Sequence, residues 1–315
     1  MDMSRINETP LRPQMKRGVW GILATPFNDA DLSVDLKSLA RLVQLYLSAG
    51  ASGVVALGVL GEAARLSSTE RRQVLTTVVK AANGLPVVAG MAALATAPAV
   101  EEAMWAADAG VRAAMVLIST NNAARLIDHL HQISDSSGLG IVLQDHPLTT
   151  GIVIQPDVLA QVVRDSGVVV AVKAESPPTA PAIAAIVPKV DIPVFGGLGG
   201  VALLDELLAG SAGAMTGFAV PEALVATVQS WERGGYRAAR EAYSPWMPLV
   251  LCEAQDKVSL AIRKEILKRR GVIAGAKVRP PGIDITPALL HALDAHLGAV
   301  SIASASNVVT VEHVG

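Results

Sequence analysis

From Gly18 onward, short apolar runs rich in β-branched residues alternate with longer amphipathic segments. Such runs are typical of buried strands, and such segments are typical of helices that cover a parallel sheet. The pattern predicts strands at residues 18–27, 53–58, 85–91, 113–118, 140–146, 168–175, 192–197 and 212–218. Eight strands, each followed by a helix-length segment, favour an α/β fold of the closed (β/α)8 TIM-barrel type over an open sheet. No GxGxxG motif follows the first strand, as a dinucleotide-binding sheet would require.

The pattern changes after the eighth strand, where only helices are predicted, near residues 222–233, 236–252, 254–270 and 286–298. A C-terminal helical cap of this kind usually packs beside a barrel. We therefore divide the chain into an N-terminal extension (1–17), the barrel (18–220), a C-terminal helical region (221–300) and a tail (301–315). The two termini are expected to be the least ordered parts.

Composition narrows the class of protein. Of the 315 residues, 51% are hydrophobic and 17% are charged, which is sufficient for one large core. The net charge is −2 and the basic residues are scattered, so neither nucleic acid nor a membrane surface is an expected partner, and a small metabolite is favoured. We find neither a signal peptide nor a membrane span. The single cysteine, Cys252, excludes an internal disulfide and suits a reducing compartment, so a cytoplasmic location is predicted.

A lysine stands within one of the most apolar predicted strands, Val-Val-Val-Ala-Val-Lys-Ala-Glu at 168–175. Desolvation of an ammonium in a strand buried on both faces is costly, which favours the free amine. A free amine can attack a carbonyl and form an iminium that serves as an electron sink. Barrel active sites lie at the C-terminal ends of the strands, where Lys173 falls. An ion pair with Glu175, or a side chain that extends out of the barrel mouth, is an equally good explanation from these residues alone.

Several short motifs, in this order, resemble the dihydrodipicolinate synthase and N-acetylneuraminate lyase superfamily. They are Gly-Ile-Leu-Ala-Thr-Pro-Phe at 21–27, Gly-Val-Leu-Gly-Glu at 58–62, Pro147 and Gly151, Val172-Lys173, and Gly196-Gly197. The resemblance spans residues 18–298. It implies a homodimeric or homotetrameric lyase of the class I aldolase type that acts on a small 2-keto acid such as pyruvate and requires no cofactor. It also makes Lys173 the imine-forming residue.

Two motifs depart from this family. Members that use pyruvate usually carry Gly-Thr-Thr-Gly-Glu after strand two, and here Val59 and Leu60 replace the threonines. Backbone N–H groups of this loop can still receive a carboxylate, but a hydroxyl relay cannot operate. The alternative is that Val59 and Leu60 only pack within a loop that binds nothing. We place the substrate contacts at Thr25, Gly58, Val59, Leu60, Gln144, Gly196 and Gly197.

The second departure is at the end of strand five, Leu-Gln-Asp-His-Pro at 143–147. Gln144 stands where the family has a tyrosine that serves as general acid and base, and the three tyrosines of the chain all fall in predicted helices. Thr149 replaces the arginine with which synthases of lysine biosynthesis bind their aldehyde substrate. Dihydrodipicolinate synthase activity itself is therefore not expected.

Strand alternation indicates which residues replace the tyrosine. Glu175 shares a face with Lys173, and His146 shares a face with Gln144, so both can point towards the substrate. A histidine, or a carboxylate in a dry pocket, can serve as general acid or base. The predicted catalytic residues are Lys173, Glu175 and His146, although His146 could instead cap the strand end. Asp145 should face the other way and brace a helix or loop.

Other signals are weaker. His129 and His131 lie two residues apart in a predicted surface helix, so no metal site is expected. The glycines at 196–200 could cradle a phosphate, although the resemblance favours a keto-acid pocket. The basic residues Arg263, Lys264, Lys268, Arg269 and Arg270 are interpreted as a solvated helix face.

The leading hypothesis is an aldol cleavage, aldol addition or dehydration of a sugar-acid-like 2-keto acid through an imine at Lys173. The second hypothesis is a barrel that binds a small carboxylate ligand without imine chemistry. A metal- or phosphate-dependent barrel enzyme is the third.

Overall fold

The computed structural model describes residues 15–300, so most of the predicted extension (1–14) and the predicted tail (301–315) lie outside the described residues. Eight strands form one parallel sheet. They are β1 (Gly18–Ile22), β2 (Gly53–Ala56), β3 (Val87–Gly90), β4 (Ala113–Leu117), β5 (Gly140–Asp145), β6 (Val169–Ala174), β7 (Val194–Phe195) and β8 (Gly213–Thr216).

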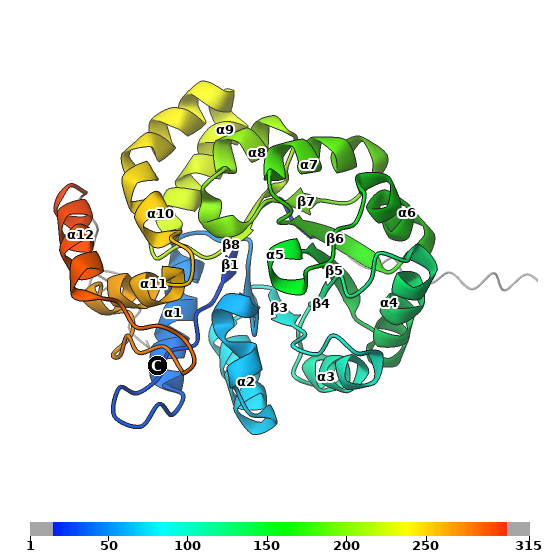
Figure 1. The fold of residues 1–315 in the computed structure, drawn as a ribbon, viewed down its shortest axis with the longest axis horizontal. Coiled ribbons are helices and arrows are strands. Elements are labelled where there is room, and N and C mark those ends of the chain that lie inside the picture. The colour runs from blue at the N-terminus through cyan, green and yellow to red at the C-terminus, as the bar shows by residue number, and fades with distance from the viewer. Residues whose placement is uncertain (1–14, 301–315) are drawn as a thin grey trace, which may run out of the picture.

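The sheet closes on itself. The strands follow the order β7-β6-β5-β4-β3-β2-β1-β8, and a parallel bridge between Gly196 and Ala214 joins its two ends. The N–H of Ala212 donates to the carbonyl of Val194 across the same seam, with an N–O distance of 2.7 Å. Figure 1 shows the helices arranged around this closed sheet. The predicted (β/α)8 barrel is therefore confirmed.

The helices between the strands are α1 (Leu36–Ser48), α2 (Ser68–Ala82), α3 (Thr96–Asp108), α4 (Ala123–Ser137), α5 (Pro147–Thr150), α6 (Pro156–Ser166), α7 (Thr179–Ile186) and α8 (Leu203–Leu208). Short 3-10 turns are η1 (Val59–Gly61), η2 (Ala63–Arg65), η3 (Val187–Lys189), η4 (Leu198–Gly200) and η5 (Ser244–Trp246). The helices after β8 are α9 (Pro221–Tyr243), α10 (Met247–Glu253), α11 (Ser259–Arg269) and α12 (Pro287–Gly298), at one side of the barrel in Figure 1.

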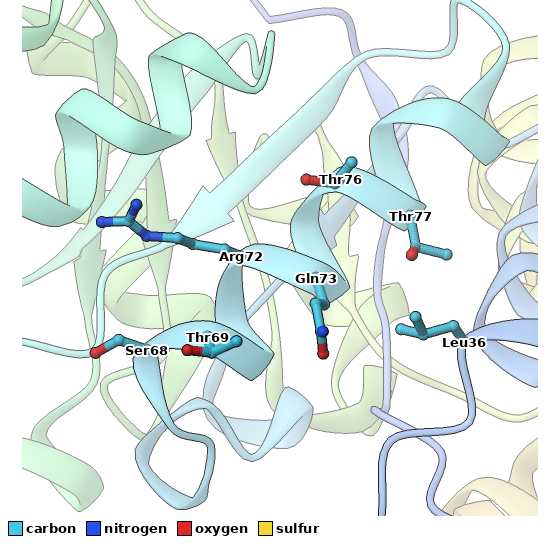
Figure 2. Close-up of a pocket in the computed structure, with 7 residues that line it drawn as sticks. All are labelled: Leu36, Ser68, Thr69, Arg72, Gln73, Thr76 and Thr77. Carbon is cyan, nitrogen blue, oxygen red and sulfur yellow. The ribbon is translucent and has the colours of Figure 1, made fainter.

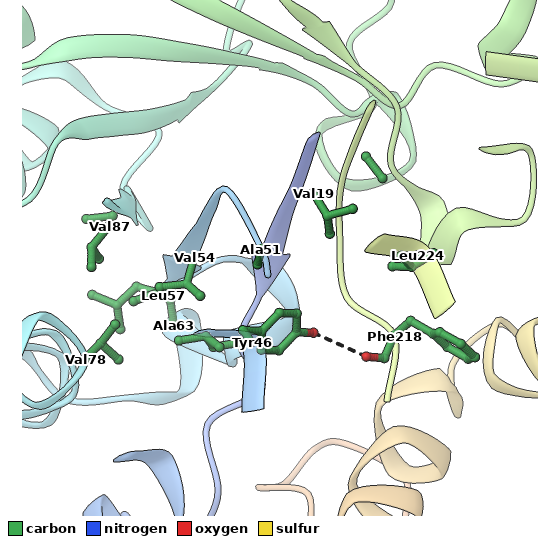
Figure 3. Close-up of a cluster of buried hydrophobic side chains, with 14 of the residues drawn as sticks. Val19, Tyr46, Ala51, Val54, Leu57, Ala63, Val78, Val87, Phe218 and Leu224 are labelled. Atoms are coloured by element: carbon green, nitrogen blue, oxygen red, sulfur yellow. Dashed lines mark hydrogen bonds between the residues drawn. The ribbon is translucent and has the colours of Figure 1, made fainter. Parts of the chain in front are cut away.

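Apolar side chains form two separate clusters, because successive residues of a strand face opposite sides of the sheet. The inner cluster fills the barrel and includes Trp20, Val55, Met115, Phe195 and Met215. The outer cluster packs the strands against the helices. Figure 3 shows part of the outer cluster, in which the Tyr46 hydroxyl donates to the carbonyl of Phe218 at 3.3 Å. The interior of the barrel is thus a packed core, and the ends of its strands are the place to look for a ligand site.

Some predicted element bounds were wrong for identifiable reasons. The first strand ends at Ile22 and not at residue 27, because the chain leaves the sheet before Pro26, which has no N–H to donate. The helix predicted over 236–252 is divided. Its first part continues α9 through a kink at Gly234 and Gly235, and η5, which contains Pro245, separates it from α10. Between residues 15 and 300, no helix combines the length and the apolar character that crossing a membrane requires.

Candidate active site

Lys173 lies near the C-terminal end of β6 and faces the inside of the barrel. Ala171, two residues earlier, belongs to the inner cluster, and Lys173 pairs in register with Gln144 of β5. Only 5% of Lys173 is exposed to solvent. The sequence therefore places an amine where a barrel binds its ligands, next to the side chain that replaces the family's tyrosine.

Glu175 is the partner of this lysine. Its Oε2 lies 2.9 Å from Nζ of Lys173 and accepts a hydrogen bond from Nε2 of Gln144 at 2.7 Å. Its Oε1 accepts from the N–H of Leu198 at 3.1 Å. Burial by itself would raise the pKa of Glu175, but the ammonium of Lys173, together with His146 and Gln144, outweighs it and holds the pKa below its ordinary value. Glu175 is thus an ionised carboxylate fixed against the lysine.

His146 and Asp145 follow at the end of β5. His146 is half-buried, and its Nδ1 has no hydrogen-bond partner within the described residues. Burial lowers the pKa of His146, with Glu175 opposing and Lys173 adding to the effect. His146 occupies the N-cap position of α5, but its side chain makes no capping hydrogen bond. The lowered pKa favours the neutral imidazole, whose Nδ1 is a buried atom without a hydrogen-bond partner among the described residues, close enough to Lys173 and Glu175 for their charges to act on it.

The brace to a helix or loop that was predicted for Asp145 is not seen at its Oδ1. The residue is buried, and no described residue donates a hydrogen bond to its Oδ1. Its backbone carbonyl accepts the N–H of Glu175 at 2.8 Å. Burial raises the pKa of Asp145 to about 6, and the charge of Glu175 adds to the rise.

The loop after β2 presents its two unusual residues to different surroundings. Leu60 packs against the inner cluster, whereas Val59 is 49% exposed and lines a cavity. Thr25 holds the loop in place, because its hydroxyl donates to the carbonyl of Gly61 at 2.6 Å. The N–H groups of Val59 and Leu60 open the turn η1, where an intrahelical partner does not exist.

Glu62, at the end of this loop, connects it to the C-terminal helices. Its Oε1 lies 2.5 Å from Nζ of Lys264 on α11, and its Oε2 accepts from Arg65 at 2.9 Å and from the N–H of Arg279 at 3.0 Å. Nζ of Lys264 also lies 4.3 Å from the centre of the Phe27 ring. These contacts bury Lys264 completely.

The prediction of a solvated basic face on this helix was therefore wrong for three of its five residues. Lys264, Arg263 and Arg270 are buried. Nε of Arg263 lies 2.6 Å from Oε1 of Glu253, and Arg270 pairs with Glu222 at 2.6 Å. All three acidic partners lie outside α11, so the sequence of the helix gave no sign of them.

Gly196 and Gly197 follow β7, and each leaves space for a buried carboxylate. A methyl group at Gly197 would overlap Oε1 of Glu175, and one at Gly196 would overlap Oε2 of Glu206. Any larger residue at these positions would displace one of the two acids. This gives the two glycines a role that the resemblance did not suggest, beside the substrate contact predicted for them.

Glu206, on α8, is a buried acid that the sequence analysis missed. Its Oε1 accepts from the hydroxyl of Thr179 at 2.6 Å, and its Oε2 has no partner among the described residues. Burial raises the pKa of Glu206 to about 7, the hydroxyl of Thr179 opposes the rise and the charge of Glu175 adds to it. The sequence gave no clear signal of this, because Glu206 follows a second acidic residue, Asp205, in the short helix.

We expect Glu206→Gln to stabilise the protein more at pH 8 than at pH 5. The folded-state pKa of Glu206 is above that of the unfolded chain, so its contribution is complete below pH about 4.5 and is lost as the pH rises to about 7. Glutamine avoids this loss. The gain in free energy of unfolding from the substitution should therefore be larger at pH 8 than at pH 5 by up to about 3 kcal/mol. Urea denaturation of both proteins measures it, with the exposed Glu101→Gln as control. An equal effect at both pH values would contradict the shifted pKa.

A cavity of about 250 Å³ lies at the C-terminal ends of β2 to β5. Its apolar wall consists of Leu57, Val59, Met91, Leu94, Met115 and Leu117. The charged and polar side chains that border it are Glu62, Arg65, Gln144 and Thr149. Gln144 therefore contacts the cavity and also donates a hydrogen bond to Glu175, the partner of Lys173.

A second hollow, of about 510 Å³, lies on the outside of the barrel. Figure 2 shows that its lining comes from α2, with Leu36 at the start of α1. Arg72 is the only charged side chain of this lining, and its guanidinium lies 5.7 Å from the centre of the Trp105 ring. No strand contributes to it, so we place the candidate site at the barrel mouth.

Within residues 15–300, no group of three or more histidine, cysteine or carboxylate side chains is arranged to hold a metal. His129 is buried, contrary to the surface position predicted for it, and its Nδ1 lies 2.9 Å from the hydroxyl of Thr96. His131 bonds separately to the carbonyl of Ser166 at 2.7 Å. The two histidines thus face different neighbours, as their spacing predicted.

The closed parallel barrel, its C-terminal helices and the buried lysine at a strand end are typical of lyases of the class I aldolase type. The chain is a member of the dihydrodipicolinate synthetase family, whose model matches residues 15–300. The crystal structure of dihydrodipicolinate synthase from Rhodopseudomonas palustris superimposes with a TM-score of 0.86 at 31% identity, covering 92% of this chain and 100% of that one. The predicted family and the predicted enzyme class are confirmed.

Relatives within the family have different activities. The 4-hydroxy-tetrahydrodipicolinate synthase of Methanothrix thermoacetophila is 39% identical over 158 residues, which is 49% of this chain and only 53% of the relative. The L-2-keto-3-deoxyarabonate dehydratase of Azospirillum brasilense is 25% identical over 281 residues, covering 86% of this chain and 90% of the relative. Similarity alone therefore identifies the family and leaves the substrate open.

Proposed function

We propose that this protein is a Schiff-base-forming lyase in which Lys173 attacks the carbonyl carbon of a small 2-keto acid. The observation that carries the proposal is the buried Lys173, 2.9 Å from Glu175, at the C-terminal end of β6 in a barrel of this family. A purely structural lysine would make the same ion pair. Its place at the mouth, with Gln144 leading to a cavity, favours the catalytic role.

The chemistry begins when Lys173 transfers a proton to its surroundings and its amine adds to C2 of the keto acid. Loss of the carbonyl oxygen as water leaves an iminium, which withdraws electrons from C3 and from the bond beyond it. Cleavage or formation of that bond gives an aldol reaction, and loss of a hydroxyl from C4 after deprotonation at C3 gives a dehydration. The chain supplies the lysine and the proton carriers, and no cofactor enters these steps.

Glu175 and His146 are proposed as the proton carriers in place of the family's tyrosine. Glu175 is ionised and in contact with Lys173, so it can accept the proton that the amine must lose. His146 is held towards its neutral form and has an unbonded Nδ1, so it can accept a proton from the substrate. The N–H groups of Val59 and Leu60 are proposed to receive the substrate carboxylate, with Thr25 and Gly58 fixing the loop.

Borohydride trapping tests the proposal. The protein is incubated with pyruvate, reduced, digested and analysed by mass spectrometry for an adduct on the peptide that carries Lys173. We expect a reduced adduct at Lys173 and at no other lysine. Folded protein that gives no adduct with pyruvate or longer 2-keto acids would contradict imine formation and favour the second hypothesis, a barrel that binds carboxylates without this chemistry.

We expect Glu175→Gln to lower turnover by about 10²- to 10⁴-fold, the usual effect of removing a general acid or base, while trapping at Lys173 slows but still occurs. Glutamine retains the shape and the hydrogen-bonding reach of the side chain but cannot accept a proton. Steady-state rates and trapping yields for the variant and the wild type measure the two effects separately. Full activity of Glu175→Gln would show that the proton is carried elsewhere.

The homodimer or homotetramer implied by the resemblance and the cytoplasmic location predicted from the single cysteine remain predictions, and analytical ultracentrifugation would measure the first of them.

A further inference from the structure

We propose that the cavity beside Gln144 receives the tail of the substrate and that this tail is an apolar, preferably aromatic, group rather than a polyol or a second carboxylate. The inference rests on the proposed function, in which the keto-acid head reacts at Lys173. Gln144 connects the two parts, because it borders the cavity and bonds to Glu175 at 2.7 Å. A substrate bound at Lys173 would therefore extend past Gln144 into the cavity.

The apolar wall of the cavity disfavours a polyol. Six hydrophobic side chains form this wall, and two of them, Met91 and Met115, have flexible thioethers that adapt well to flat rings. Hydroxyl groups placed against such a wall would lose their bonds to water and gain none, which weakens binding. Apolar carbon in the same place is favoured by its removal from water.

The polar groups of the lining are mostly engaged with one another. Both oxygens of Glu62 are bonded, to Lys264 on one side and to Arg65 and the N–H of Arg279 on the other. Gln144 donates its amide hydrogen to Glu175. The groups that remain free, the amide oxygen of Gln144 and the outer N–H groups of Arg65, are fewer than the hydroxyls of a polyol, and Thr149 lies at the exposed rim.

A second carboxylate would lack a cation of its own. Arg65 is the only basic side chain in the lining, and it already pairs with Glu62 at 2.9 Å. A substrate carboxylate would compete with Glu62 for this guanidinium and would face the charge of Glu62 as well. At the other side of the cavity, Thr149 offers a hydroxyl and no charge. The electrostatics of the cavity therefore favour a neutral tail.

The size of the cavity suits one ring. An apolar cavity of about 150 Å³ in a protein accommodates benzene. The volume here is about 250 Å³, which leaves space for a ring with a short linker to the keto acid. Val59 and Leu60, which replace the family's threonines, extend the same apolar character, Val59 in the cavity wall and Leu60 against the inner cluster.

The test compares four 2-keto acids in the borohydride assay: pyruvate as the reference, 2-oxo-4-phenylbutanoate, a 2-keto-3-deoxy sugar acid and 2-oxoglutarate. The measured quantity is the concentration that gives half-maximal adduct on the peptide carrying Lys173. We expect the phenyl acid to reach it at a concentration roughly tenfold or more below that of the polyol and of the diacid, because only its tail gains from burial.

A matched pair of variants locates the tail. Leu94→Asn places an amide in the cavity wall at nearly constant volume and should raise the half-saturating concentration of the phenyl acid roughly three- to tenfold, with pyruvate unchanged. Leu208→Asn makes the same substitution at a residue that is 58% exposed and outside the lining, and should change neither value. Equal values for the two variants with the phenyl acid would overturn its placement in this cavity.

The outcomes separate this inference from the proposed function. If pyruvate is trapped but the polyol or the diacid binds as well as the phenyl acid, the apolar tail is wrong and the imine chemistry stands. If no acid is trapped by folded protein, the proposed function is overturned, and the inference that rests on it falls with it.

Discussion

Lys173→Arg should fold like the wild type and lose turnover by at least about a thousandfold, because a guanidinium keeps the positive charge but is not a nucleophile at accessible pH. Arginine can retain the ion pair with Glu175, whose Oε2 now lies 2.9 Å from Nζ. The variant therefore separates the charge of the lysine from its reactivity. Steady-state kinetics with the best-trapped keto acid measure the turnover, and thermal unfolding measures the stability of the variant.

Lys173→Ala is a poorer test, because it leaves Glu175 buried without its ion-pair partner and is expected to destabilise the barrel. The double variant Lys173→Met/Glu175→Gln removes both charges at similar volume and serves as the folding control. We expect it to be as stable as Lys173→Arg and equally inactive. Turnover that survives in Lys173→Arg would exclude an imine at this residue.

Lys264→Met should destabilise the protein by about 3–5 kcal/mol, because it leaves Glu62 as a buried carboxylate without its closest cation. The side chains of the two residues are 0% and 1% exposed, so water cannot replace the ammonium. Burial lowers the pKa of Lys264 in spite of the adjacent Glu62, which indicates how strongly the pair is removed from solvent. Urea denaturation measures the loss in free energy of unfolding.

The same helix provides the control for this variant. Lys268 pairs with Asp29 at 3.5 Å, and both side chains are more than two-fifths exposed, so Lys268→Met should cost less than about 1 kcal/mol. Glu62→Gln/Lys264→Met removes the buried charge on both sides and should recover most of the stability that the single variant loses. Similar losses for Lys264→Met and Lys268→Met would contradict the importance of the buried pair.

Local pattern was sufficient to predict much of the barrel and part of the site. The alternation of apolar runs with amphipathic segments predicted the eight strands and the helical segments between them. The two-residue repeat of a strand placed Glu175 on the face of Lys173, and the ion pair between them is consistent with it. A register irregularity between β5 and β6 occurs at Ile141 and Val142, before these residues, so it does not disturb their alternation.

Pairings between distant segments could not be predicted in this way. Lys264 and Glu62 are 202 residues apart, and a helix full of basic residues looks solvated until its acidic partners are placed. Glu206 meets Gly196 only because α8 packs on the end of β7. The cavity also depends on residues at the ends of β2, β3, β4 and β5 and on the loops that follow three of these strands, which meet at one end of the barrel.

The sequence by itself determined the barrel, the family and the lysine within it, because the periods of strands and helices and the short motifs are local properties of the chain. Only the tertiary structure decided the surroundings of that lysine. Pairing of β6 with β5 and β7 brings Glu175, Gln144 and Gly197 together from three strand ends, and removal of water from this end shifts the pKa values of Asp145 and Glu206. Those effects depend on distance and burial, which no local pattern specifies.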